Sequence, residues 1–175
     1  MLLLEEFRLV DIQISSDGVG KKFEYCRHPA VWKEVEENID KFISAKNNSN
    51  TEWLLSTCIS ISAFNVYDFF ETFEHYASKG MSIYVNMVHD HHGVKVLPRE
   101  LKETVINKLN SFESNYLPQQ WDKDRNMIIQ HLSNTESIES EWINFWSELE
   151  MRDTIRNESF KEIFSDYYNE IKKYL

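Results

Sequence analysis

Strand-like and helix-like patterns alternate along the first two-thirds of this chain, and this alternation limits the fold more than any other feature. Residues 8–15 are typical of a strand, and a helix is predicted from Pro29 to the polar run ending at Asn50. Further strands are expected over 53–61 and 81–88, each followed by a helix. Strands separated by helices form parallel sheets. The sequence therefore predicts an α/β fold of about three parallel strands, as a barrel or an open sheet, with apolar strands covered on both faces.

The last third of the chain predicts helices only. A helix over 121–132 is followed by two Ser-x-x-Glu sequences, Ser133–Glu136 and Ser159–Glu162, which are typical of helix starts. We expect residues 1–112 to form the β/α part and residues 113–175 to form a helical extension packed against it.

Composition and charge exclude several classes of protein. With 175 residues, 42% of them hydrophobic, the chain can bury the core of one domain. A net charge of -10 disfavours nucleic-acid binding, because phosphate contacts need clustered Lys and Arg. No apolar run reaches the roughly 18 residues of a membrane span. Cys26 and Cys58 form neither a disulfide framework nor a metal-ligand spacing, so a cytoplasmic location is expected.

Polar side chains follow each of the three predicted strands. Ser15 and Asp17 follow the first strand, Asn65 follows the second and is expected to cap the next helix, and the run His89–His92 follows the third. Sites in parallel α/β folds lie at the carboxyl ends of the strands. We therefore expect these groups to meet at one edge of the sheet, although Asp-Gly at 17–18 is also typical of an ordinary turn.

Several segments carry a family resemblance. They are Ser15-x-Asp17-Gly18, Tyr25-x-Arg27-x-Pro29-x-x-Trp32, Val35-Glu36-x-Asn38-Ile39, Asn65-Val66-Tyr67, Tyr84-x-Asn86-x-Val88-His89-Asp90 and Arg152-Asp153-x-Ile155-Arg156. This set resembles the second half of the radical S-adenosylmethionine (SAM) enzymes, closest to members with a twitch-type or SPASM-type extension. The similarity is clearest over about residues 8–110 and weaker beyond.

The resemblance implies the second half of a (β/α)6 partial barrel, with SAM bound beside Ser15, Asp17, Arg27, Asn65 and Asn86. Arg27 would reach the SAM carboxylate, since a guanidinium fork suits a carboxylate. The family cleaves SAM with a [4Fe–4S] cluster held by the three cysteines of a C-x-x-x-C-x-x-C loop. This sequence has no such loop and lacks the glycine-rich motif that meets the SAM amino group. We therefore assign no catalytic residue, expect the cluster only from a missing N-terminal segment, and expect the chain to be inactive alone.

Two other hypotheses stay open. The chain could be a non-catalytic binding or interaction module, as a homodimer or with an N-terminal half-barrel, because a half-barrel exposes strand edges. It could instead bind metal through His89, Asp90, His91 and His92, since imidazoles and carboxylates bind zinc or iron. Adjacent side chains rarely converge on one ion, so these four are candidates and no metal ligand is assigned. The sequence does not identify a small-molecule or peptide substrate.

Overall fold

The computed structural model describes residue 4 and residues 6–175, and its centre is a parallel sheet of three strands in the order β1-β2-β3. The strands are β1 (Leu9–Ser15), β2 (Glu52–Ile61) and β3 (Ser82–Met87). In the register, Ser15 lies beside Cys58, and Cys58 lies beside Tyr84. The predicted strand positions and the parallel α/β class are confirmed.

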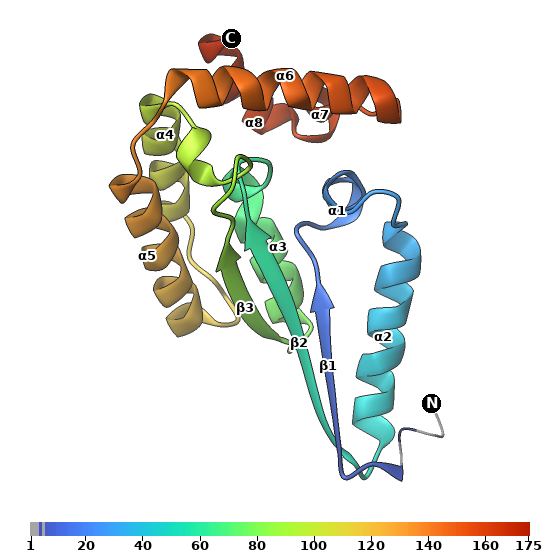
Figure 1. The fold of residues 1–175 in the computed structure, drawn as a ribbon. Coiled ribbons are helices and arrows are strands. Elements are labelled where there is room, and N and C mark those ends of the chain that lie inside the picture. The colour runs from blue at the N-terminus through green and yellow to red at the C-terminus, as the bar shows by residue number, and fades with distance from the viewer. Residues whose placement is uncertain (1–3, 5) are drawn as a thin grey trace.

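Helices cover one face of this sheet. The two that connect successive strands, α2 (Trp32–Asn48) and α3 (Phe69–Ser78), contact β2 and β3 respectively. The covered face buries apolar side chains at alternate strand positions: Val10, Trp53, Leu55, Ile59, Ile61 and Ile83. Figure 1 views the sheet from its other side, with α3 behind the strands. The prediction of strands covered on both faces is wrong, because no helix of the described residues covers the second face, and Leu54 and Tyr84 on it are exposed.

The two edges of the sheet differ. The helices α4 (Arg99–Asn110) and α5 (Pro118–Asn134) lie beside β3 (Figure 1). On α5, the Gln120 side-chain amide donates a hydrogen bond to the Ile83 carbonyl of β3. At the opposite edge, β1 pairs with β2 alone among the described residues.

The C-terminal helices lie over the carboxyl ends of the strands. Figure 1 shows α6 (Glu139–Arg156) crossing above them, with α7 (Phe160–Ile163) and α8 (Ser165–Ile171) beneath it. The buried Tyr167 hydroxyl donates a hydrogen bond to the Ala63 carbonyl at 3.0 Å. Residues from both the first 112 positions and the remainder enter one hydrophobic core, so the C-terminal helices pack against the rest of the described chain.

The segment between β1 and α2 differs from the prediction. A short helix, α1 (Gly20–Cys26), precedes α2, and α2 begins at Trp32 instead of Pro29. The physical reason is a side chain from α1: the carboxylate of Glu24 accepts a hydrogen bond from the Trp32 backbone N–H at 3.0 Å. This bond satisfies one of the free N–H groups at the start of α2.

The two predicted helix starts in the last third have different outcomes. Ser159 accepts a hydrogen bond from the Glu162 N–H at 3.3 Å, so this helix start is confirmed, although the helix breaks after Ile163. The start predicted at Ser133 is wrong, because α5 continues through this residue and α6 begins at Glu139. Within the described part of the chain, every helix is too short or too polar to cross a bilayer.

Candidate functional site

The uncovered side of the sheet forms a polar surface that we call the open face. Its side chains occupy every second strand position: Leu9, Asp11, Gln13, Ser15, Glu52, Leu54, Ser56, Cys58, Ser60, Ser82, Tyr84 and Asn86. A hollow of about 240 Å³ lies on this face, near its amino-terminal end. Parallel sheets are usually buried on both faces by apolar side chains. A face that is both polar and uncovered is therefore available to a ligand or a partner.

Two of the predicted SAM residues, Ser15 and Asn86, lie on the open face near the carboxyl ends of β1 and β3. Both are exposed. The Asn86 side-chain amide donates a hydrogen bond to the Cys58 sulfur at 3.0 Å, and Cys58 is also the register partner of Ser15. The structure therefore places Ser15 and Asn86 on either side of Cys58, at the same end of the same surface.

The other three predicted residues, Asp17, Arg27 and Asn65, meet at the carboxyl ends of the strands in what we call the rim network. The Asp17 carboxylate pairs with the Arg27 Nε at 2.7 Å and accepts a hydrogen bond from the Ser60 N–H at 2.8 Å. The Asn65 amide donates to the carbonyls of Asp17 and Ser60, each at 2.9 Å. Its side-chain oxygen accepts from the Ser62 N–H at 2.8 Å. The side chain of Asn65 thus fastens the loop after β1 to the end of β2.

This network explains why Asn65 does not cap a helix. It precedes the short 3-10 helix Val66–Asp68, but its side chain makes no capping bond because its amide is committed to the rim network.

Arg27, unlike Asn65, keeps hydrogen-bonding capacity for a ligand. Its Nε forms the ion pair with Asp17, and its terminal nitrogen atoms make no hydrogen bond found among the described residues. Arg27 can therefore still bind an anionic group.

Above the rim, α6 contributes Arg152, to which the sequence assigned no role. Its guanidinium donates a hydrogen bond to the Tyr25 carbonyl at 2.6 Å and lies 4.7 Å from the Tyr25 ring. The Tyr25 hydroxyl donates to Asp153 at 2.8 Å, and burial raises the pKa of this tyrosine.

A cavity of about 250 Å³ lies between the rim network and α6. It is lined by Asp17, Cys26, Ser60, Asp90, His92 and Arg152, among others. This volume is just below the roughly 300 Å³ at which small-molecule pockets usually begin.

The two cysteines occupy different surroundings. Cys26 lines the rim cavity, and burial raises the pKa of its thiol to about 12. The thiolate is the reactive form of cysteine, so this shift disfavours Cys26 as a nucleophile near pH 7. Cys58 lies on the open face and accepts the hydrogen bond from Asn86.

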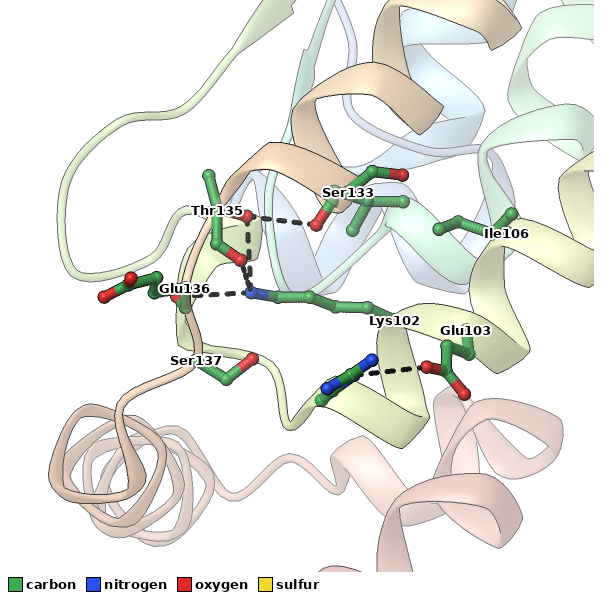
Figure 2. A pocket seen from close by; sticks show the side chains of 9 residues that line it. Lys102, Glu103, Ile106, Ser133, Thr135, Glu136 and Ser137 are labelled. Carbon is green, nitrogen blue, oxygen red and sulfur yellow. Dashed lines mark hydrogen bonds and ion pairs between the residues drawn. The ribbon is translucent and has the colours of Figure 1, made fainter.

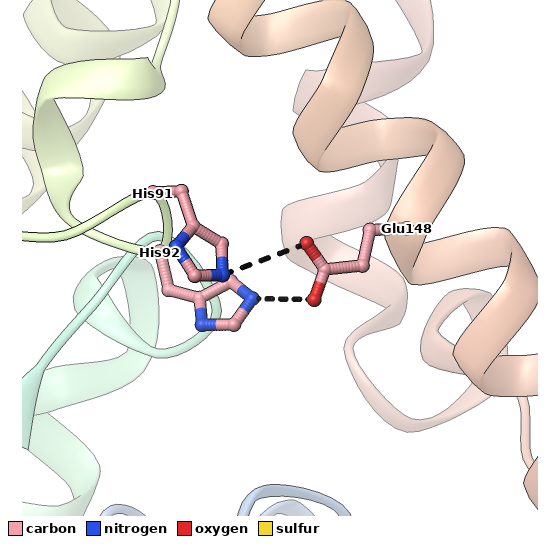
Figure 3. Close-up of side chains that lie close together, drawn as sticks. All are labelled: His91, His92 and Glu148. Carbon is pink, nitrogen blue, oxygen red and sulfur yellow. Dashed lines mark hydrogen bonds and ion pairs between the residues drawn. The ribbon is translucent and has the colours of Figure 1, made fainter.

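The loop after β3 places its four candidate metal ligands in different directions. His91 and His92 both face Glu148 of α6 (Figure 3), whose carboxylate lies 3.8 Å from the His91 Nε2 and 2.9 Å from the His92 Nε2. His89 instead packs against the ring of His131, and Asp90 accepts a hydrogen bond from the His92 N–H at 2.8 Å. Two of the four candidates are thus brought together, with a third group from 56 positions downstream. No local pattern in the sequence marks Glu148, because it reaches the loop only through the packing of α6.

A separate cavity of about 580 Å³ lies between α4 and the segment joining α5 to α6 (Figure 2). The Lys102 ammonium donates to the Thr135 carbonyl at 3.0 Å, the Thr135 hydroxyl at 3.2 Å and the Glu136 carbonyl at 3.4 Å. Burial lowers the pKa of Lys102 to about 8. These contacts satisfy acceptors beyond the end of α5, so Lys102 has a structural role here.

Comparison of the chain with protein-family models, with curated proteins and with solved structures gave no match. The family resemblance therefore depends on the sequence segments themselves.

Proposed function

We propose that this chain is half of a partial β/α barrel of the radical SAM type, and that its open face and rim bind SAM and position a substrate. The observation that carries the proposal is the uncovered polar face of a parallel sheet whose other face is covered by helices. In a β/α barrel, helices cover the outer face of the strands and the inner face lines the interior. Helices on one face and an uncovered second face are compatible with a segment of such a barrel, and the polar side chains suit an interior that binds a ligand instead of one packed with apolar groups.

The groups on the open face and at the rim match the chemistry of SAM. SAM presents a carboxylate, an ammonium group and ribose hydroxyls, each of which needs hydrogen-bond partners when bound. Ser15 and Asn86 offer a hydroxyl and an amide at the carboxyl end of the face, and Arg27 offers its free guanidinium nitrogens to the carboxylate. When bound, SAM supplies the adenosyl group that the family's chemistry releases as a radical.

In this proposal, Asp17 and Asn65 act by holding the binding groups in place. Asp17 fixes the Arg27 side chain through its Nε, and Asn65 holds the loop that contains Asp17. Such support matters because binding groups that are ordered beforehand lose less entropy when a ligand binds.

The cysteines of this chain do not fit the family's iron–sulfur cluster. A [4Fe–4S] cluster of this type needs three thiolates, and the sequence holds only Cys26 and Cys58. Burial raises the pKa of Cys26 to about 12, which disfavours its thiolate further. We therefore assign binding and positioning to this chain and assign the redox step to another segment or chain.

The proposal is tested by calorimetric titration of the chain with SAM up to millimolar concentration. Ser15→Ala and Asn86→Ala should each weaken SAM binding about fivefold, the effect of losing roughly 1 kcal/mol of hydrogen bonding. Ser82→Ala is the matched control, since Ser82 is an exposed serine on the same face, at the opposite end of the strands. Absence of SAM binding, or an equal loss in Ser82→Ala, would contradict the proposal.

A second function, as an interaction module, is favoured by exposed apolar groups on the open face and at the β1 edge. Leu9 and Leu54 are each 47% exposed and Tyr84 is 55% exposed. Unpaired strand edges and exposed apolar side chains promote association. The partner would be a second copy of this chain or a cluster-bearing half-barrel.

Sedimentation equilibrium of the purified chain tests this second function for the homodimer. A dimer that Leu54→Arg dissociates and Ile143→Arg leaves intact would support association through the open face, since Ile143 is exposed on α6 instead. A monomeric chain at all concentrations would exclude the homodimer.

A further inference from the structure

His91, His92 and Glu148 bring three metal-ligating side chains together, the one such group of three found within the described part of the chain (Figure 3). Their ligand atoms all lie within 4.8 Å of one another. The nearest pair, His92 Nε2 and the Glu148 carboxylate, is 2.9 Å apart, and His91 Nε2 is 3.8 Å from the second carboxylate oxygen.

These separations are close to those of a zinc site. Zinc bonds to imidazole nitrogen and carboxylate oxygen are about 2.0–2.1 Å long, so a tetrahedral arrangement places neighbouring ligand atoms roughly 3.3 Å apart. The distances from the Glu148 carboxylate to the His92 Nε2 (2.9 Å) and to the His91 Nε2 (3.8 Å) lie on either side of this value. Small side-chain rotations would therefore bring all three groups to one ion.

The backbone of the loop explains how two consecutive histidines face the same carboxylate. Asp90 holds the His92 N–H at 2.8 Å, and the His92 carbonyl accepts a hydrogen bond from the Ala63 N–H at 2.8 Å. The next residue, Gly93, leaves no room for a side chain, because a Cβ there would lie 2.4 Å from the Val88 carbonyl oxygen. The loop is thus held in a tight turn by contacts on both sides of the histidines.

The helix that carries the carboxylate is also held in place. Its helix is anchored beside it by the buried side chains Phe145 and Leu149. The Phe64 ring lies 4.9 Å from the Phe145 ring and 5.2 Å from the His92 ring, so one aromatic side chain packs against both the helix and the loop. The site is therefore assembled from two elements whose relative position is fixed by the core.

The geometry points to a divalent-cation site, ligated by the two imidazoles of His91 and His92 and the carboxylate of Glu148, which takes Zn²⁺. Two imidazoles and a carboxylate suit first-row divalent metals, and they leave at least one coordination position open. A net charge of -10 further favours a cation over an anion. The ion would link the loop after β3 to α6 beside the rim cavity, to which His92 contributes. This site does not depend on SAM binding.

The test is the stoichiometry and affinity of Zn²⁺ on the untagged chain, measured by competition with a chromophoric chelator. We expect one Zn²⁺ per chain and at least a tenfold loss of affinity in His91→Ala and in Glu148→Gln. His28→Ala is the matched control, because His28 pairs with the Glu158 carboxylate at 3.0 Å without belonging to a group of three ligands. This variant should keep the parental affinity.

The substitutions are chosen so that a loss of binding can be separated from unfolding. The side chain of His91 is 68% exposed, so its replacement should leave the circular dichroism spectrum unchanged. Zn²⁺ should also raise the melting temperature of the parent and of His28→Ala, but not that of His91→Ala. No Zn²⁺ binding by the parent, or equal affinity in His91→Ala, would overturn the proposal.

Discussion

Asn65 and Asn86 are the same residue type near the ends of neighbouring strands, yet the structure uses them in opposite ways. Asn65 is 4% exposed, and its amide bonds three backbone groups of the rim network. Asn86 is exposed on the open face, where its side-chain partner is the Cys58 sulfur. The polar groups of the rim network are thus bonded within the protein and hold its loops together, whereas those of the open face are exposed to solvent and available to a ligand.

The largest expected difference between the two regions is in the free energy of unfolding. Asn65→Ala removes hydrogen bonds to three backbone groups and should lower it by about 3 kcal/mol, at roughly 1 kcal/mol for each group. Asn86→Ala should change it by less than about 0.5 kcal/mol. Urea unfolding of both variants measures the difference, and equal losses would contradict the distinction between rim and open face.

A pair of aspartates gives the same comparison with a smaller effect. Asp17→Asn removes the charge that pairs with Arg27 at 2.7 Å, and should lower the free energy of unfolding by about 2 kcal/mol. Asp11→Asn is the control, because Asp11 is exposed on the open face. If Asp11→Asn proved as costly as Asp17→Asn in the same urea experiment, the open face would be part of the structural framework.

The two cysteines should differ by at least tenfold in their rate of modification by a thiol-specific disulfide reagent. Burial raises the pKa of Cys26 to about 12, so very little of it is thiolate at pH 8, and its reaction should speed up as the pH rises. Cys58 lies on the open face and should react first.

The single variants Cys26→Ser and Cys58→Ser assign the two rates of modification. SAM should slow the reaction of Cys58 if it binds the open face as proposed. Faster reaction of Cys26 than of Cys58 at pH 8 would show that the rim is the more accessible region.

The smallest predicted effect is on the pH dependence of stability and comes from Lys102, a buried lysine that lies outside both the rim and the open face. Its pKa is about 8 in the folded chain, against 10.5 for an ordinary lysine. Between these values the unfolded chain binds more protons, so the stability should rise with pH, by on the order of 1 kcal/mol from pH 7 to pH 9. Lys102→Met should abolish this rise, as followed by urea unfolding at each pH. A parent and variant with the same pH dependence would contradict this assignment.

The sequence was sufficient to predict the sheet and most of the residues at its carboxyl end. An alternating apolar run predicts β1, and runs rich in apolar and β-favouring residues predict β2 and β3. The parallel order then brings the loops with Asp17, Asn65 and His92 to one rim. That inference needs only the direction of the strands, which the intervening helices determine.

The open face and the zinc site could not be predicted in the same way. Apolar residues such as Leu54 and Tyr84 made both strand faces resemble buried ones, and only the placement of the helices shows which face is uncovered. Glu148 reaches His91 and His92 because Phe145 and Leu149 pack α6 over the rim. Packing between distant segments has no local signal in a single sequence.

The most direct test of the account is an NMR titration of the isotope-labelled chain with SAM, which maps where the ligand binds. We predict that the largest shifts occur at Ser15, Cys58 and Asn86 on the open face, and at the side chain of Arg27. We predict little change around Lys102, which lies in a separate cavity. Shifts confined to other surfaces, or no shifts at millimolar SAM, would contradict the proposal that the open face is a SAM-binding surface.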